Sequence, residues 1–474
     1  MGVNGITIPL SYVLSPEGKD INKAYVDIIL EAEIPVLCVN KAARKQRLMP
    51  FKVLYGTSEK FWQRGGGWDY FLTGESLDII KEKTGADFIS FTPSKPKPPE
   101  KKPEVEQGFG SKHKVFVEMP IGKRIEQLDK NKQRLTEILE FQTKRETIIT
   151  EALVDTTIDA ALINHSVLLD ALRLTDEEAK KLTQDLVDST FEMVKSSVNV
   201  ISEQIFNNEL MNTLVQKSNG TIVQHMTRVY LTGISFLSYY HNLVSTSRAI
   251  QKLRMRFSTK YRKYYLHLLP HIFPEDVVLE RVFFGGMRAF TFELYYKWAV
   301  GFLIHDIGKA AAVEYHEGEA KYDRETVVEH VKLGYKNIME KTNYPKEACL
   351  ITGYHHEYYG DPDGYGYFRA YLQQYKKSNP DAKQDFCMTY DLEPMVDYKA
   401  IAYFPAKVLE IIDIFDSLTD PMRVYRKPMS PDEALVMMRE QFIDKQYKID
   451  VILFDIFVDF INERDKPGYK RVYT

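Results

Sequence analysis

The chain has 474 residues, which is enough for two or three domains that each bury their own core. Hydrophobic residues make up 44% of it and charged residues 27%, values that are ordinary for a soluble globular protein. The formal net charge of -3 argues against a surface built to bind a nucleic-acid polymer, whereas a small anionic ligand needs only a local positive site.

The first residues and the cysteines indicate where the protein resides. The segment MGVNGITIPLSYV lacks the basic and apolar regions of a signal peptide, and no stretch reaches the ~18 to 20 uninterrupted apolar residues of a membrane helix. Cys38, Cys349 and Cys387 are too scattered for a disulfide framework or a zinc ribbon. We therefore expect reduced thiols, no transmembrane segment and a cytoplasmic location.

Residues 1–92 are predicted to form a small α+β regulatory domain. Alternating apolar residues indicate strands at Phe51–Tyr55, Tyr70–Leu72 and Asp87–Phe91, and Glu75–Lys83 is expected to be a short helix. No catalytic cluster is visible in this part of the chain.

Residues 93–111 are rich in proline and lysine, which predicts an extended and exposed linker. Residues 112–214 are predicted to be a mostly helical connecting region, in which Thr175 and Glu178 form a capping box. The apolar spacing that follows is typical of a packed helical layer. A helical stem that supports a homodimer is the alternative interpretation.

Histidines and aspartates recur along the helical region 215–474. A single His-Asp pair is a weak signal, because a buried histidine is more often a core residue than a metal ligand. Asp413, however, interrupts an apolar helix, where an unpaired buried carboxylate would cost on the order of several kcal/mol. Imidazole and carboxylate together suit Mn, Fe, Ni or Zn, and a bridging carboxylate allows two ions ~3.5–4 Å apart. The candidate ligands are His225, His305, Asp306, His330, His355, His356 and Asp413.

In this order, and with Lys309 in the segment Leu303-Ile-His-Asp-Ile-Gly-Lys309, the set resembles the HD-GYP family of metal-dependent phosphodiesterases. The segment Asp363-Gly-Tyr-Gly-Tyr-Phe368 resembles the DGxGYP loop of that family, with phenylalanine in place of the final proline. The stretch from Asp413 to Ala434 is similar to the region that follows the family's last metal-binding aspartate. The resemblance covers about Gly220 to Ala434.

The resemblance implies a mainly α protein. A C-terminal all-helical HD-type metal-binding bundle over 215–474, with insertions near 245–300 and 368–400, would follow the α+β domain and the helical stem. It also implies an enzyme that hydrolyses cyclic di-GMP to pGpG, or onward to GMP, with two divalent ions, Fe or Mn. One ion would bind His225, His305 and Asp413, the other His330, His355 and His356, and Asp306 would bridge the two.

The same resemblance assigns residues to the substrate. Lys309 lies one helical turn from His305 and would stabilise the phosphate charge that develops in the transition state. Arg423 and Arg426 share one face of a helix or turn and could hold phosphate or stack on guanine. Tyr367, in the glycine-rich loop, would contact base or phosphate, although packing between helices explains most of the nearby tyrosines equally well.

Three departures from the family pattern leave alternatives open. His225 precedes His305 by 80 residues, a much larger gap than in the family, and the inserted residues include the basic run Arg248–Lys263. That run is a solvated helix face, an attractor of anionic substrate, or a surface for an acidic partner or membrane. Thr221 stands where members with a third metal carry glutamate, so two metals are expected. Phe368 and the insertions keep open a cyclic di-GMP sensor without turnover, or a phosphohydrolase of another nucleotide.

Overall fold

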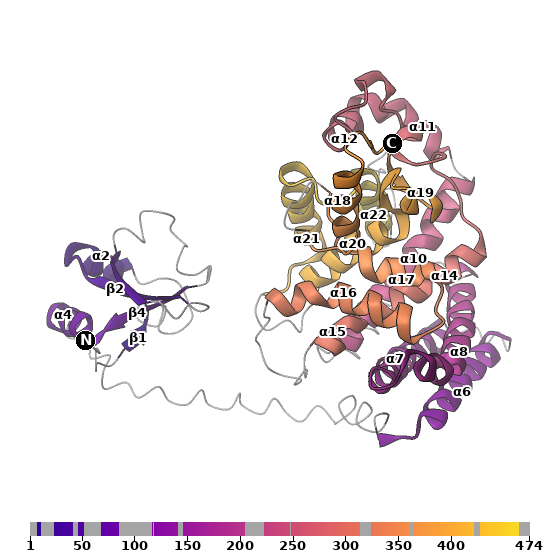
Figure 1. The fold of residues 1–474 in the computed structure, drawn as a ribbon, viewed down its shortest axis with the longest axis horizontal. Helices are drawn as coiled ribbons and strands as arrows, with labels where there is room; N and C mark the ends of the chain where they lie inside the picture. Colours follow the sequence, from indigo (N-terminus) through magenta and orange to yellow (C-terminus); the bar gives the residue numbers. More distant parts are fainter. Residues whose placement is uncertain are drawn as a thin grey trace. The chain divides into compact units, whose positions relative to one another are not determined.

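The computed structural model describes two compact units, Met1–Glu106 and Gln107–Thr474 (Figure 1). The residues described are 7–10, 23–40, 46–51, 68–84, 116, 118–140, 146–203, 222–246, 248–312, 324–359, 364–420 and 427–463. The predicted linker 93–111 therefore lies outside the described residues, as do Thr221, Arg423 and Arg426. The four-part division predicted from sequence stays a prediction.

The smaller unit is an antiparallel sheet with two helices, as an α+β domain requires. Its strands occur in the order β1-β4-β2-β3. Alternate residues of β2, such as Val36 and Cys38, are buried with Ile29 of α2 and Ile80 of α4, because successive side chains of a strand point to opposite faces. The elements are β1 (Thr7–Pro9), α2 (Lys23–Glu31), β2 (Pro35–Asn40), β3 (Gln46–Pro50), β4 (Trp68–Thr73) and α4 (Gly74–Thr84).

Two of the elements predicted for this unit are confirmed. The strand expected at Tyr70–Leu72 lies inside β4, and the helix expected at Glu75–Lys83 lies inside α4. Of the strand expected at Phe51–Tyr55 only Phe51 is described, and it directly follows β3, which ends at Pro50 opposite Pro35 of β2. Residues 52–67 and 85–92 lie outside the described part.

The larger unit is almost entirely helical, which confirms the mainly α fold class. Three long helices come first: α6 (Ile121–Glu140), α7 (Glu146–Ala171) and α8 (Asp176–Glu203). The middle of the unit holds α10 (Ile222–Thr246), α14 (Phe292–Ile304), α15 (Ile307–Ala312), α16 (Arg324–Lys341), α17 (Lys346–Tyr354) and α20 (Phe404–Thr419). The remainder comprises α11 (Ala249–Arg256), a π-helical turn (Phe257–Tyr261), α12 (Arg262–Leu268), α13 (Leu279–Val282), α18 (Phe368–Ser378), α19 (Glu393–Val396), α21 (Pro431–Met437), a second π-helical segment (Met438–Lys445) and α22 (Val451–Glu463).

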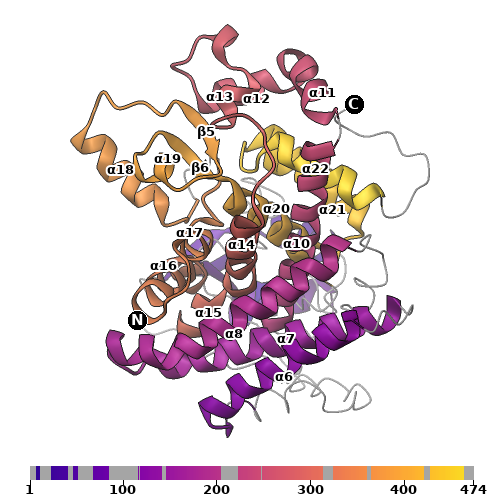
Figure 2. The same cartoon turned by 90° about the vertical axis from the view of Figure 1, so that its right-hand side faces the viewer.

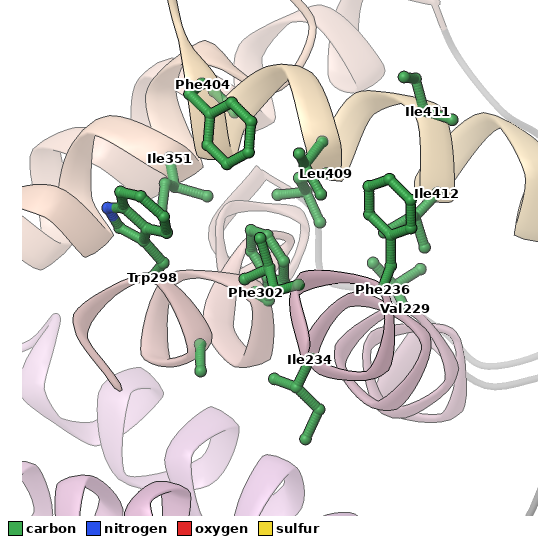
Figure 3. Close-up of a cluster of buried hydrophobic side chains, with 14 of the residues drawn as sticks. Val229, Ile234, Phe236, Trp298, Phe302, Ile351, Phe404, Leu409, Ile411 and Ile412 are labelled. Atoms are coloured by element: carbon green, nitrogen blue, oxygen red, sulfur yellow. The ribbon is translucent and has the colours of Figure 1, made fainter. Parts of the chain in front are cut away.

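The core of this unit lies where α10, α14, α17 and α20 meet (Figure 3). Phe302 of α14 lies beside α10, and the approach is close because residue 233 of α10 is glycine. A Cβ atom at Gly233 would lie 2.3 Å from Cδ2 of Phe302. Trp298 is fully buried in the same cluster and donates its indole N–H to the hydroxyl of Tyr403, at 2.9 Å. The four helices that carry most of the candidate ligands are thus held in one tightly packed layer.

The helices α6, α7 and α8 lie side by side along one end of the unit in Figure 2. Their buried side chains belong to the same hydrophobic core as those of α10 to α22, so the core runs across the predicted boundary at residues 214 and 215. Within the described residues, the stretch Ala152–Ala171 is long and apolar enough to cross a membrane. Of its most apolar window, 83% is buried inside the protein, as in a core helix.

A two-stranded parallel sheet in the second predicted insertion was not expected from the sequence. It joins β5 (Phe386–Thr389) to β6 (Ala400–Tyr403), with Met388 opposite Ala402. The strands have only four residues each, too short for a period of two to be distinguished from a buried helix segment. Tyr403 leads directly from β6 into α20, so the sheet sets the start of the helix that carries Asp413.

Candidate metal centre

Seven polar side chains from five helical segments meet inside the larger unit. His225 lies on α10 and His330 on α16, while Asp413 lies on α20. His305 ends α14 and is followed by Asp306, and His355 ends α17 and is followed by His356. All seven are buried, and none is more than 8% exposed. A buried cluster of this kind requires compensating charge, because imidazole and carboxylate groups lose their hydration on folding.

Asp306 lies at the centre of the cluster, and its two oxygens face different histidines. Oδ1 lies 3.1 Å from Nε2 of His330 and 3.8 Å from Nε2 of His355. Oδ2 lies 3.4 Å from Nε2 of His225 and 3.7 Å from Nε2 of His305. A carboxylate placed in this way has one oxygen available to each of two neighbouring ions.

Asp413 spans the opposite side of the cluster. Its Oδ1 atom lies 2.9 Å from Nε2 of His225, and its Oδ2 atom lies 3.6 Å from Nε2 of His356. The ligand atoms of His225, His305 and Asp413 lie within 4.8 Å of one another, and so do those of His330, His355 and His356. A third group, His305, Asp306 and His355, overlaps both. The structure thus brings together all seven residues that the sequence analysis selected.

Two of the histidines are held at their outer ring nitrogen by backbone carbonyls. His305 and His355 each end a helix and use Nδ1 to bond the carbonyl three residues earlier, Phe302 at 2.9 Å and Thr352 at 2.8 Å. Carbonyls at a helix C-terminus have no partner within the helix, so they are natural acceptors for these rings. An Nδ1–H that donates outward leaves the Nε2 lone pair directed inward, which is the arrangement found in metal-binding histidines.

The inward atoms fit a cation. Within the described residues, Nε2 of His305 is buried and has no hydrogen-bond partner, and the buried Oδ1 of Asp306 faces the imidazoles of His330 and His355. Both are lone-pair donors, and a buried polar atom of this kind is costly unless something binds it. Imidazole nitrogen with carboxylate oxygen is a donor set that suits Fe, Mn, Ni or Zn. The residues present therefore fit a divalent metal ion.

The electrostatics of the cluster also require positive charge. Burial opposes ionisation of Asp306 and Asp413, yet Lys309 and the nearby histidines hold the pKa of each carboxyl well below its usual range. Burial lowers the pKa of His356 to about 3, so its ring is neutral and able to bind metal. Burial also lowers the pKa of His225, but the carboxylates of Asp306, Asp413 and Asp416 outweigh this effect and raise the pKa to about 10. A cation among these carboxylates would replace the proton that they otherwise hold on His225.

Two residues that the sequence analysis did not select support His225 from behind. Nδ1 of His225 lies 2.8 Å from Oδ2 of Asp416, one turn after Asp413 on α20. Arg228 donates to the same carboxylate through Nε, at 2.7 Å, and also pairs with Asp420. The sequence contained a signal for Asp416, because it follows Asp413 by three residues in an apolar helix. Residues three apart lie on the same face of a helix, so both carboxylates need partners if that face is buried.

A glycine pair holds α15 against α16, and so fixes Asp306 relative to His330. A Cβ atom at Gly308 would lie 1.8 Å from the carbonyl oxygen of His330 and 2.6 Å from the amide nitrogen of Gly334. Only a residue without a side chain allows this approach. The glycine in the His-Asp-Ile-Gly segment therefore has a packing role that the motif alone did not reveal.

The predicted substrate residues are placed differently from one another. Nζ of Lys309 contacts Oδ2 of Asp306, directly at the cluster. Tyr367 instead packs on Tyr335, at 5.2 Å between ring centroids, and its hydroxyl accepts a hydrogen bond from Tyr371. Tyr365, from the same loop, lies against the cluster with its ring centroid 4.5 Å from that of His356. A substrate contact by Tyr367 stays a prediction.

The basic run Arg248–Lys263 forms α11, the π-helical turn and the start of α12. Arg254 pairs with Glu280 and Lys260 pairs with the buried Asp455, at 2.8 Å. These two cations thus serve local pairing, and most of the other basic side chains of the run are exposed. The solvated helix face is the interpretation that these contacts favour.

Comparison with known proteins adds little. No protein-family model matches the sequence, and no curated protein matches it. Among solved structures, Bd1817, a HDG"Y"P protein from Bdellovibrio bacteriovorus, aligns over 97% of this chain and 100% of its own length, with 11% identity and a TM-score of 0.37.

Proposed function

We propose that this protein is a metal-dependent phosphohydrolase of the HD-GYP type, with two ions held by the buried histidines and aspartates. The observation that carries the proposal is the position of Asp306, whose two oxygens face two separate pairs of imidazoles. One ion would be held by His225, His305 and Asp413, the other by His330, His355 and His356, and Asp306 would offer one oxygen to each. When bound, two such ions lower the pKa of a water and neutralise phosphate charge.

The remaining residues have defined tasks in phosphodiester hydrolysis. Asp416 and the carbonyls of Phe302 and Thr352 keep three imidazoles in the tautomer that presents Nε2 to the centre. Lys309 contacts Asp306 and carries a positive charge at the edge of the centre, where it stabilises charge that develops on the phosphate. Burial of the cluster in the helical core keeps bulk water away, which strengthens each of these interactions.

The proposed substrate is cyclic di-GMP, in a cytoplasmic protein. The support is the ordered motif set, above all the Gly-Tyr-Gly-Tyr loop beside His356. The proposed main product is linear pGpG with little GMP, because Thr221 offers no carboxylate for a third ion. A linear product carries an additional negative charge at its terminal phosphate, and two ions offer less compensation for it than three.

Elemental analysis and a turnover assay on the full chain test the proposal. Protein loaded anaerobically with Fe²⁺, or with Mn²⁺, is expected to hold two ions per chain and to convert cyclic di-GMP to pGpG, as followed by chromatography. Binding of cyclic di-GMP without turnover would show a sensor, and turnover of other nucleotides alone would show a different phosphohydrolase. A chain with no bound metal would refute the centre itself.

A further inference from the structure

Tyr365 is held rigidly over the proposed metal centre. Its ring centroid lies 4.5 Å from that of His356 and 6.2 Å from that of His330. The backbone directly after Tyr365 is anchored twice, because Gly366 donates its N–H to the carbonyl of His356, at 3.1 Å, and Tyr367 donates its N–H to the carbonyl of Gly353, at 2.8 Å. There is no room for a side chain at residue 366, where a Cβ atom would lie 1.8 Å from Oε2 of Glu357.

A chain of hydrogen bonds links this tyrosine to a metal-site histidine. Nδ1 of His356 lies 3.0 Å from the hydroxyl of Tyr358. The hydroxyl of Tyr358 is in turn hydrogen-bonded to that of Tyr365. The hydrogen bonds therefore run from the outer nitrogen of His356 through the hydroxyl of Tyr358 to Tyr365, whose ring lies against the rings of His356 and His330.

Metal binding sets the direction of this chain. If Nε2 of His356 binds an ion, the ring proton must be on Nδ1, which then donates to the oxygen of Tyr358. Tyr358 accepts at its oxygen and donates its own hydrogen to Tyr365. Tyr365 accepts in its turn, and its hydrogen is then directed to an acceptor beyond the chain.

We propose that the hydroxyl of Tyr365 is a hydrogen-bond donor to a phosphate oxygen of the substrate, oriented by His356 through Tyr358. The inference rests on the metal centre of the proposed function but not on the identity of the nucleotide. The hydroxyl of Tyr365 needs a hydrogen-bond acceptor near the two proposed cations and Lys309. If both carboxylates of the centre bind metal, an anionic oxygen of the substrate is the acceptor best suited to this positive surrounding. Tyr365 is therefore a further catalytic residue, beside the predicted Tyr367.

The test measures binding of inorganic phosphate to the full chain loaded with Mn²⁺, by titration calorimetry. Tyr365→Phe keeps the ring and removes only the hydroxyl, so it is expected to retain both ions and to weaken phosphate binding about 10- to 100-fold, as for loss of a hydrogen bond to a charged acceptor. Tyr358→Phe breaks the series of hydrogen bonds between His356 and Tyr365, and it is expected to weaken phosphate binding less than Tyr365→Phe does. Tyr335→Phe, on α16, is the matched control and is expected to bind phosphate like the unchanged protein.

Phosphate binding that is unaltered in Tyr365→Phe would overturn the inference, and so would loss of metal from that variant, since a donor to substrate is not a ligand. Phosphate binding that depends on Tyr365, in a protein that fails to hydrolyse cyclic di-GMP, would uphold the inference while refuting the proposed substrate. A chain that binds no Mn²⁺ would refute both, because the direction of the hydrogen bonds depends on the ion.

Discussion

Asp416 accepts a hydrogen bond from His225 across 191 residues of sequence, with Oδ2 and Nδ1 2.8 Å apart. The same carboxylate receives Nε and Nη2 of Arg228, at 2.7 and 2.9 Å. This places a fixed charge behind His225, on the side away from Asp306 and Asp413. The carboxylate–histidine pair is the part of the site that most directly connects the packing of α10 on α20 with the ability to bind an ion.

Asp416→Asn is expected to lower metal affinity by about 10- to 100-fold, because the outer partner that fixes the ring of His225 loses its charge. Asp420→Asn is the control: Asp420 pairs with Arg228 but has no direct role at His225. Both variants should unfold at lower urea concentration, and only the first should lose metal affinity in competition with a chelator. Equal metal affinities in the two variants would contradict the assignment.

Asp306→Ala is expected to bind less than one ion per chain and to show no hydrolysis. The reason is that the two oxygens of Asp306 lie within 4 Å of four different imidazoles, two for each oxygen. Elemental analysis and the turnover assay measure this, and circular dichroism checks that the helices remain. A variant that kept two ions and full activity would show that Asp306 is not a bridge.

Lys309→Ala is expected to keep its metal and to lose kcat by about 10²- to 10³-fold, the usual cost of removing one donor that acts in the transition state. Lys309 lies at the edge of the centre and contacts Asp306 without being a ligand. Lys332→Ala removes an exposed lysine of α16 and serves as the control. An unchanged kcat in Lys309→Ala would show that Lys309 does not stabilise the transition state.

Gly308→Ala is expected to destabilise the protein by about 1–3 kcal/mol or more, because overpacking separates α15 from α16. The added methyl would meet the carbonyl oxygen of His330 at 1.8 Å, so metal should be lost as well. Gly122→Ala provides the contrast: nothing lies within 4 Å of a Cβ atom there, and α6 should gain rather than lose stability. Urea unfolding measures the free energy of unfolding of both variants. Equal stability would show that α15 and α16 are not closely packed at Gly308.

The pH dependence of stability is expected to change in Asp450→Asn. Burial raises the pKa of Asp450 from 3.8 to about 6, although the amides of Ile452 and Leu453 and the hydroxyl of Tyr265 bond to it. A raised carboxyl pKa means that the folded state retains a proton that the unfolded chain has lost. This contribution to stability is therefore present below pH 4 and is lost as pH rises to about 6.

Asparagine at position 450 cannot ionise, so the variant should gain stability relative to the unchanged protein as pH rises from 4 to 7. The relative gain is on the order of 3 kcal/mol at most for a shift of about two pKa units. Urea unfolding at pH 4.5 and pH 7 measures it, and comparing the two proteins at each pH removes the contribution of other groups. A difference that does not vary with pH would show that Asp450 titrates normally.

Local sequence determined the helices and several of their ends. Thr175 with Glu178 forms the capping box that the sequence predicted, and Ser430 with Glu433 forms another, because residues three apart at a helix start can reach each other's backbone whatever surrounds them. The sequence also pointed to the seven candidate ligands, since polar residues within apolar helical segments need a buried partner.

Tertiary structure decided how those residues meet. The bond between Asp416 and His225, the choice of Tyr365 over Tyr367 beside His356, and the crossing of Gly308 over His330 depend on how separate helices are packed. The short strands β5 and β6 likewise pair across an intervening helix. Such contacts are set by the positions of whole elements in three dimensions, whereas periodicity and capping report only on neighbours within about one helical turn.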